Sequence, residues 1–359
     1  MGIPATPSGI TAEYLTAVLR QSGTIKDNSV KSVEVRMVPA GSGFAGQGAY
    51  VTIEYERESN GAPAKMFAKM SSADAEVRGR LRSIGLYEAE TGFYRDLSHQ
   101  AKIRVPRAYA CLYDPKTGAC LLLIEDIRHL RFADHVAGCT AADARTVVTG
   151  VARMHAHYWR NEKLLQCAWL RSAETERARL AELYRAMLPR WEQKWAHLNP
   201  PGVIRAAHAL AGFFEVWHDS HLTDSWTLVH GDFRPDNLAF DESGEVVAFD
   251  WQTARRYPSS RDLAYYIASL KTELRRENEA ELLELYHRTL AANGVRDYSM
   301  EELRVSYRRS MGTPLYVHVV AGGLMDFSSE RGQELARVAT ERLDAVIEDH
   351  NFAEWKPGN

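Results

Sequence analysis

Short runs of alternating apolar and polar residues mark the first third of the chain. Such alternation occurs at residues 31–39 and 50–55, and the segments 63–70, 107–113 and 120–124 also read as strands, the last two across the turn at 114–118. A period of two places one set of side chains on a single face, as in a strand that buries one side. The pattern therefore predicts five strands in this part of the molecule.

Helical spacing begins early and then dominates the rest of the chain. Thr11 is a candidate N-cap, with Glu13 in the first turn after it, and residues 73–97 have a helical pattern between the third and fourth strands. In residues 143–159, apolar side chains recur three or four positions apart, as on the buried face of a helix. Further helical segments are expected at 164–197, 273–291 and 300–350.

A glycine-rich stretch connects the first two strands. Gly41, Gly43 and Gly46 fit the pattern G-x-G-x-x-G, with Ser42 between the first two. That pattern alone would equally suit a dinucleotide-binding fold or a plain hairpin tip. A dinucleotide-binding turn opens a helix, whereas here a second strand follows, as in the flap that covers ATP phosphates in kinases. The context therefore favours a phosphate-covering loop.

The most informative motif is His-Gly-Asp-Phe-Arg-Pro-Asp-Asn at residues 230–237, followed by Phe-Asp-Trp at 249–251. It presents Asp232, then Asn237, then Asp250. ATP-dependent phosphoryl transfer needs an aspartate that accepts the proton of the attacking hydroxyl. It also needs an asparagine and a second aspartate that hold Mg²⁺ on the triphosphate. A short apolar run before the motif and a polar turn at 241–244 predict a loop entering a hairpin, whose second strand delivers Asp250.

These motifs resemble those of the aminoglycoside phosphotransferase and choline kinase superfamily, in which H-G-D-x-x-x-x-N replaces the H-R-D-x-x-x-x-N of protein kinases. The chain is most similar to the bacterial ecdysteroid-kinase-like branch, through Asp-Trp-Gln at 250–252, Ser-Arg-Asp-Leu-Ala-Tyr-Tyr at 260–266, and segments 10–15 and 136–139. The resemblance covers nearly the whole chain. It implies an α+β, two-lobed, protein-kinase-like fold, with a small antiparallel β-rich N-lobe and a larger, mostly helical C-lobe.

The same resemblance implies roles for several further residues. Lys69, at the end of the third strand, would contact the α- and β-phosphates, and its ion-pair partner on the next helix would be Glu90, with Glu88 as the alternative. Backbone groups of Glu125 and Ile127 would bind the adenine edge in the segment that joins the lobes.

Sequence position and the resemblance also give expectations for residues near Asp232. Arg234 stands where protein kinases place a lysine near the γ-phosphate. His230 is expected to be a buried structural histidine, and Asp262 an N-cap or first-turn acid that links back to the 230–237 loop. The pair His155 and His157 invites a metal-site interpretation, but residues two apart on a helix diverge. A packed or solvated role is therefore favoured for both.

Length and composition limit the classes of protein that remain. A chain of 359 residues exceeds the usual size of one hydrophobic core, which favours two lobes, at residues 1–127 and 128–359. A net charge of −3 from 44 basic and 47 acidic residues provides no basic field for nucleic acid. Four cysteines without a C-x-x-C pair suit a reducing cytoplasm, and no apolar stretch is long enough for a membrane span. Nothing in the sequence indicates the oligomeric state.

Two functional interpretations remain open at this stage. The first is a kinase that uses ATP and Mg²⁺ to phosphorylate a hydroxyl of a metabolite or natural product, with an aminoglycoside or a choline-like alcohol as alternative acceptors. The second is a nucleotide-binding pseudokinase that serves as a regulatory module. The presence of Lys69, Asp232, Asn237 and Asp250 together favours catalysis.

Overall fold

The computed structural model describes residues 2–38, 46–58, 61–325 and 327–352. The chain forms two compact units. Unit 1 comprises residues 1–131 and 249–253, and unit 2 comprises residues 132–248 and 254–359. The short segment 249–253 therefore returns to unit 1 from within the sequence of unit 2, and it carries Asp250.

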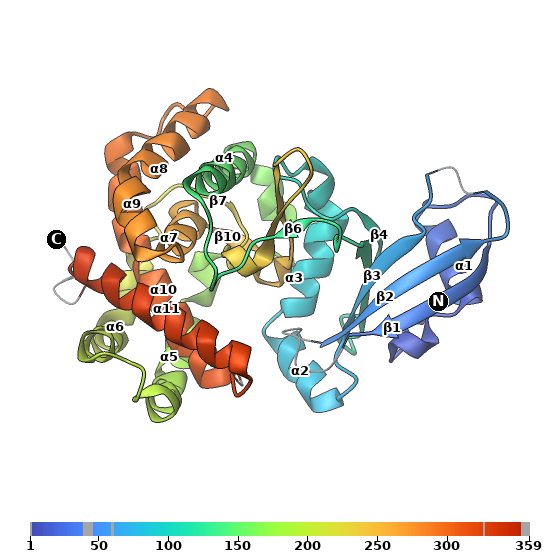
Figure 1. The fold of residues 1–359 in the computed structure, drawn as a ribbon, viewed down its shortest axis with the longest axis horizontal. Helices are drawn as coiled ribbons and strands as arrows, with labels where there is room; N and C mark the ends of the chain where they lie inside the picture. The colour runs from blue at the N-terminus through green and yellow to red at the C-terminus, as the bar shows by residue number, and fades with distance from the viewer. Residues whose placement is uncertain (1, 39–45, 59–60, 326, 353–359) are drawn as a thin grey trace. The chain divides into compact units, whose positions relative to one another are not determined.

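Unit 1 is built on a five-stranded antiparallel sheet with the order β1-β2-β3-β5-β4 (Figure 1). Its strands are β1 (Val30–Met37), β2 (Gly46–Tyr55), β3 (Lys65–Ser71), β4 (Ala108–Tyr113) and β5 (Cys120–Glu125). All five strands were predicted from the sequence. Gly46 begins β2 where any side chain would collide with the β3 backbone, because a Cβ there would lie 2.0 Å from the carbonyl oxygen of Met70.

One face of this sheet is covered by α1 (Ala12–Gln21). Thr11 caps the helix as predicted, since its hydroxyl accepts from the Tyr14 N–H at 3.1 Å. Leu15 and Leu19, both fully buried, pack into the same core cluster as the inward side chains of the sheet. The amphipathic helix thus closes one side of the sheet.

The segment between β3 and β4 differs from the single helical run expected from the sequence. It consists of α2 (Ala75–Ser83), α3 (Leu86–Gly92) and a wider π-helical turn at Phe93–Leu97. Gly85 separates the two helices with a φ of 77°, a left-handed conformation that favours glycine and ends the α-helical path. After this break, α3 contacts β4 and β5.

The segment 249–253 is anchored in unit 1 by aromatic stacking. Trp251 lies in a short 3-10 turn (Trp251–Thr253), and its ring stacks on Phe93 at 3.8 Å between centroids, with 7° between the planes. Both side chains are fully buried. Stacking of this kind adds to the burial of two large apolar rings and fixes the neighbouring Asp250.

Unit 2 is mainly helical (Figure 1). Its helices are α4 (Ala141–His157), α5 (Ala173–Trp195), α6 (Pro201–Ser220), α7 (Ser260–Ala268), α8 (Thr272–Ala292), α9 (Met300–Ser310), α10 (Gly312–Leu324) and α11 (Glu330–Asp349). The apolar positions predicted for 143–159 form the buried face of α4, where Val147, Val151 and Met154 are at most 1% exposed.

The helix expected at residues 164–197 begins later in the structure than the sequence predicted. The structure has a 3-10 turn at Glu162–Gln166, and α5 begins only at Ala173. The reason is a competing backbone pairing: the Arg171 carbonyl accepts from the Arg256 N–H at 2.8 Å, and Ser172 forms a parallel bridge with Arg256. Ser172 then caps α5 together with Thr175.

Short strands hold the 230–237 motif in unit 2. Strand β7 (Trp226–Val229) pairs with β10 (Arg255–Pro258), and β8 (Leu238–Phe240) pairs with β9 (Val246–Ala248). The turn between β8 and β9 is closed by a hydrogen bond from Asp241 N–H to the Glu245 carbonyl at 3.0 Å. Both the strand before the motif and the hairpin after it were predicted.

One core cluster of unit 2 is rich in aromatic residues from α5, α6 and α10. Trp191, Trp195 and Trp217 are at most 7% exposed, and Tyr184 and Phe214 are fully buried. These tryptophans are core residues, as the sequence favoured. No helix within the described residues is long and apolar enough to cross a membrane.

Candidate active site

An ion-pair cluster in unit 1 joins three of the residues that the sequence singled out. Lys69 Nζ lies 2.5 Å from Glu90 Oε1 and 2.8 Å from Asp250 Oδ1. The three side chains come from β3, α3 and the 249–253 segment, and all are at most 20% exposed. The choice of Glu90 over Glu88 as the partner of Lys69 is confirmed by this geometry.

The charges of this cluster depend on one another. Burial opposes the charge of Lys69, but the Asp250 and Glu90 carboxylates outweigh it and raise the lysine pKa above its ordinary value. Burial raises the pKa of Glu90, and the nearby Asp250 carboxylate adds to that rise, while Lys69 acts against it. Lys69 is therefore a permanent cation at neutral pH, held by two acidic side chains.

Local backbone geometry fixes the position of Asp250. Its φ of 65° is a left-handed value that non-glycine residues seldom adopt outside constrained sites. Gln252, two residues later, donates from Nε2 to Asp250 Oδ2 at 3.4 Å. The sequence analysis assigned no role to Trp251 or Gln252. Their position next to Asp250 in the motif could have indicated one.

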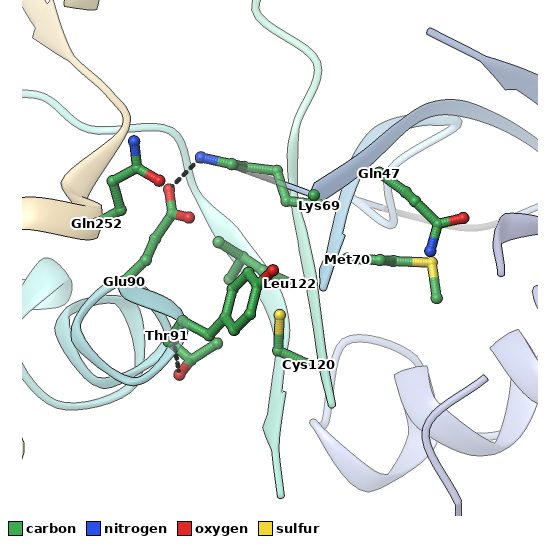
Figure 2. A pocket seen from close by; sticks show the side chains of 10 residues that line it. Gln47, Lys69, Met70, Glu90, Thr91, Cys120, Leu122 and Gln252 are labelled. Atoms are coloured by element: carbon green, nitrogen blue, oxygen red, sulfur yellow. Dashed lines mark hydrogen bonds and ion pairs between the residues drawn. The ribbon is translucent and has the colours of Figure 1, made fainter. Parts of the chain in front are cut away.

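A small pocket lies next to the ion pair within unit 1. Figure 2 shows Lys69 extending toward Glu90, with Gln252 beyond it and Cys120 and Leu122 on the neighbouring strand. Its lining residues are Gly46, Gln47, Lys69, Met70, Tyr87, Glu90, Thr91, Cys120, Leu122 and Gln252. Of the glycine-rich stretch, Gly46 lines this pocket, whereas Gly41, Ser42 and Gly43 lie outside the described residues.

The backbone groups expected to meet adenine are partly engaged already. The Glu125 N–H donates to the Arg107 carbonyl at 2.8 Å. The Ile127 carbonyl accepts from the Leu130 N–H at 2.9 Å. Within the described part of the chain, the Ile127 N–H donates to no other group. The adenine-binding role of both residues stays a prediction.

In unit 2, the 230–237 loop brings Asp232 and Asn237 together. Asn237 Nδ2 donates to both the Asp232 carbonyl and its Oδ2, each at 2.8 Å. Arg234 lies 3.4 Å from Asp232 Oδ1 through Nε, and 2.5 Å from Asp236 Oδ2 through Nη1. The opposing charges of Asp232 and Asp236 outweigh the burial of Arg234 and raise the arginine pKa.

Two further residues complete this loop and were not assigned from the sequence. Asp236 accepts from the His135 N–H at 2.9 Å as well as from Arg234. Tyr265 on α7 lies beside Asp232, and burial together with the Asp232 charge raises the pKa of its phenol. The sequence indicated Tyr265 only as part of the segment 260–266 that resembles the family. Its contact with Asp232 could not be predicted from spacing along the chain.

The loop is tied to α7 through Asp262. This carboxylate is in the first turn of α7 and accepts from the backbone N–H groups of His230 at 2.6 Å and Gly231 at 2.9 Å. Burial opposes its charge, but the hydrogen bond from His155 and the backbone donors outweigh it and lower the Asp262 pKa. The predicted first-turn position and the link to the loop are both confirmed.

The histidines near the loop are parts of this buried network. His230 is fully buried, and its Nδ1 accepts from the Asp232 N–H at 3.3 Å, in agreement with a structural role. His155 is also fully buried and lies between the Tyr286 hydroxyl and Asp262. Within the described ranges, no three His, Cys, Asp or Glu side chains group as a metal site.

Solved structures similar in fold are phosphotransferases at low sequence identity. One is a protein of Ralstonia eutropha JMP134 provisionally named an aminoglycoside phosphotransferase. It is 14% identical, with a TM-score of 0.53 over 94% of this chain and 97% of that one. Amicoumacin kinase hAmiN, in complex with AMP-PNP, Ca²⁺ and Ami, is 13% identical with a TM-score of 0.53, over 86% and 88% of the two chains. An ethanolamine kinase of Plasmodium vivax is 11% identical with a TM-score of 0.52, over 88% and 81%.

These similarities show the fold, which is the two-lobed α+β fold of protein-kinase-like phosphotransferases. No curated protein matches the chain significantly. A family model matches residues 40–296, a range that spans β2, β3, α3, the 230–237 loop and Asp250. With most of its length covered by that model, the chain belongs to the ecdysteroid kinase-like family.

Proposed function

We propose that this protein is a small-molecule kinase that uses ATP and Mg²⁺ to phosphorylate a hydroxyl group. The observation that supports this most strongly is the buried cluster of Lys69 with Glu90 and Asp250. A lysine fixed between a helix glutamate and a metal-binding aspartate is the arrangement that positions ATP phosphates in kinases. A pseudokinase would be expected to lack one of these groups, and none is missing.

The residues present suit a nucleotide with Mg²⁺. Asp250 offers a carboxylate, and Asn237 offers an amide oxygen, because both of its described hydrogen bonds use its nitrogen. Mg²⁺ prefers such oxygen ligands and takes the rest of its shell from water and phosphates. Lys69 would bind the α- and β-phosphates, and the bound ion would offset the charge that develops on the transferred group.

Asp232 would accept the proton of the attacking hydroxyl. Its carboxylate is held in place by Asn237 Nδ2 on one oxygen and approached by Arg234 Nε on the other. A base that is positioned before the substrate arrives needs no rearrangement during transfer. Arg234, a forked and permanent cation two residues later, would stabilise the transferring phosphoryl group once it exchanges Asp236 for a phosphate oxygen.

A coupled ADP-release assay with Mg·ATP tests this function. The panel of acceptors should contain steroids, terpenoid alcohols, aminoglycosides, choline and hydroxy acids, and Asp232→Ala is the control enzyme. We expect at least one acceptor to stimulate ADP release in the unmodified protein and not in the variant. Failure of Mg·ATP to bind in calorimetry, or equal turnover by Asp232→Ala, would overturn the proposal.

A further inference from the structure

A path of hydrogen bonds within unit 2 leads from helix α11 to Arg234. Arg342 on α11 donates from Nη1 to the His135 carbonyl at 2.5 Å, across 207 positions of sequence. The N–H of His135 donates to Asp236 Oδ1 at 2.9 Å. The other carboxylate oxygen of Asp236 accepts from Arg234 Nη1 at 2.5 Å. Two residues therefore connect Arg234 to a side chain that lies outside every motif of the sequence.

Arg342 is a buried cation whose acceptors are backbone carbonyls. It is 6% exposed, and it donates to the carbonyls of His135, Val136 and Ser269. Among the described residues, no carboxylate forms an ion pair with it. Burial of a cation costs free energy unless an anion pairs with it, so stability alone is a weak explanation for this arginine. Its forked donors are suited instead to holding separate backbone segments together.

The turn at residues 134–138 is closed by its own hydrogen bonds. The Gly138 N–H donates to the Asp134 carbonyl at 2.9 Å, and Asp134 Oδ1 accepts from a second N–H of the turn at 2.8 Å. Gly138 has a φ of 79°, a left-handed value that favours glycine. Arg331 pairs with the same Asp134 oxygen at 2.7 Å, but its side chain is 50% exposed. The turn is thus a compact unit that Arg342 holds through a buried contact.

Arg342 also joins the two supports of the 230–237 loop. The loop is held at its start by Asp262 of α7, and near its end by the contact of Asp236 with the turn. The same Nη1 that bonds the turn donates to the carbonyl of Ser269, the C-cap of α7, at 2.7 Å. One guanidinium therefore fixes both supports relative to each other.

The contact with the turn decides how Asp236 presents its carboxylate to Arg234. One oxygen accepts from the turn, which leaves the other directed at the guanidinium. Arg234 Nε also lies 3.4 Å from Oδ1 of Asp232, the proposed base. A cation that stands beside the reacting groups in advance needs no rearrangement when charge develops there. Displacement by about 1 Å can cost about 100-fold in rate.

We propose that Arg342 is a positioning residue, which acts through the 134–138 turn and Asp236 to hold Arg234 ready for the transferring phosphoryl group. This inference rests on the proposed kinase function and adds to it a residue far from the catalytic motif in sequence. Arg342 would touch neither the nucleotide nor the acceptor. Binding of the nucleotide itself, which we assign to groups of unit 1, should therefore not depend on it.

A mimic of the transferring phosphoryl group tests this role without an acceptor. Calorimetric titration gives the Kd of Mg·ADP with and without aluminium fluoride, and the ratio of the two values measures the gain from the mimic. The proteins are the unmodified chain, Arg342→Met, Arg234→Gln and the variant with both changes. Arg337→Gln, at an exposed arginine of α11, is the matched control. Asp134→Ala opens the turn from the surface and serves as a second variant if Arg342→Met does not fold.

We expect aluminium fluoride to tighten the binding of Mg·ADP to the unmodified protein. Arg342→Met should reduce that gain about tenfold, the loss for one charge-assisted hydrogen bond, whereas Arg337→Gln should not. Asp134→Ala should change the gain in the same direction. Mg·ADP alone should bind equally to all of these proteins. In the Arg234→Gln background, Arg342→Met should cause no further loss, because Arg342 acts only through Arg234.

An unchanged gain in the folded variants of Arg342 and Asp134 would overturn the positioning role. A tenfold loss that persists in the Arg234→Gln background would also overturn it, because a general structural effect does not require Arg234. No gain in an unmodified protein that binds Mg·ADP would remove the phosphoryl contact for which Arg234 is positioned. These three results leave the kinase assignment standing, since that assignment is tested by Mg·ATP binding and by the loss of turnover in Asp232→Ala. Failure of Mg·ADP to bind at all would reject the kinase, and this inference with it.

Discussion

Single charged side chains carry most of the chemistry that we propose for this protein. Lys69 is held by two carboxylates, and Asp232 is held by an amide and approached by a guanidinium. The sequence singled out Asp232 through the order and spacing of its motif, and Lys69 through the resemblance and its place at the end of the third strand. It could not predict Asp236 as a partner of Arg234, or Tyr265 as a neighbour of Asp232, since those contacts arise from the path of the loop and from α7.

Replacing Lys69 tests the nucleotide site in unit 1. Lys69→Met should weaken Mg·ATP binding about tenfold or more, because a charge-assisted contact to phosphate is lost. It also leaves Glu90 and Asp250 without their shared cation. The matched control is Lys65→Met, an exposed lysine four residues earlier on β3. Titration with Mg·ATP measures both variants, and equal loss in the two would contradict a specific role for Lys69.

Replacing Asp232 tests the proton acceptor. Asp232→Ala should lower kcat by about 100-fold or more, the usual contribution of a positioned general base. Nucleotide affinity should change little, because Asp232 is not among the groups proposed to bind ATP. Glu242→Ala, an exposed acid in the turn after β8, serves as the control. Steady-state kinetics with the acceptor found in the panel supply the measurement, and a loss confined to KM would count against a base.

At the scale of elements, the regular parts of the structure were predictable and the transitions were not. The strands of unit 1 follow from apolar runs bounded by turns, and the buried face of α4 follows from apolar spacing. The break at Gly85 depends on one residue in a left-handed conformation, and the late start of α5 depends on pairing with Arg256 more than eighty residues away in sequence. Neither local spacing nor propensity contains such information.

The contact of α7 with the 230–237 loop gives a pH prediction. The folded pKa of Asp262 lies below its ordinary value of 3.8, so under acidic conditions the unfolded chain binds a proton that the folded chain does not. This contribution to stability is complete above about pH 4 and is lost as the pH falls further, through the folded pKa. We therefore expect the free energy of unfolding to decrease with acidification below about pH 4.

Asp262→Asn should remove that part of the acid dependence. It should also destabilise the protein at neutral pH by about 1–3 kcal/mol, because two buried N–H groups lose a charged acceptor. Urea unfolding at pH 7 and at acidic pH measures both effects. Asp297→Asn, at an exposed aspartate that pairs with Arg160, is the control. An unchanged acid dependence in Asp262→Asn would show that other groups dominate.

For the molecule as a whole, the notable feature is that segment 249–253 belongs to unit 1 while its flanks belong to unit 2. The chain therefore passes from one unit to the other at residues 131–132, 248–249 and 253–254. The sequence placed a single boundary near residue 127, because a short return segment has no compositional signature. Unit 1 depends on this segment for the ring that stacks on Phe93.

Trp251 therefore links the stability of unit 1 to a residue far along the chain. Trp251→Ala should lower the free energy of unfolding by about 3–5 kcal/mol, the range for deleting a large buried ring. Trp251→Phe should lose less, because it keeps a ring against Phe93. Urea unfolding followed by circular dichroism compares the two variants. Equal stability of Trp251→Ala and the unmodified protein would show that the stack contributes little.

The contact between Lys69 and Asp250 also bears on the order in which ligands arrive. An isolated metal ion must compete with an ammonium group 2.8 Å away for Asp250 Oδ1. A nucleotide phosphate offers that ammonium another partner, so we expect the nucleotide to release the carboxylate for the metal. Metal and nucleotide would then each increase the affinity of the other by the same factor, as thermodynamic linkage requires. Mg²⁺ alone should accordingly bind far more weakly than Mg²⁺ in the presence of ATP.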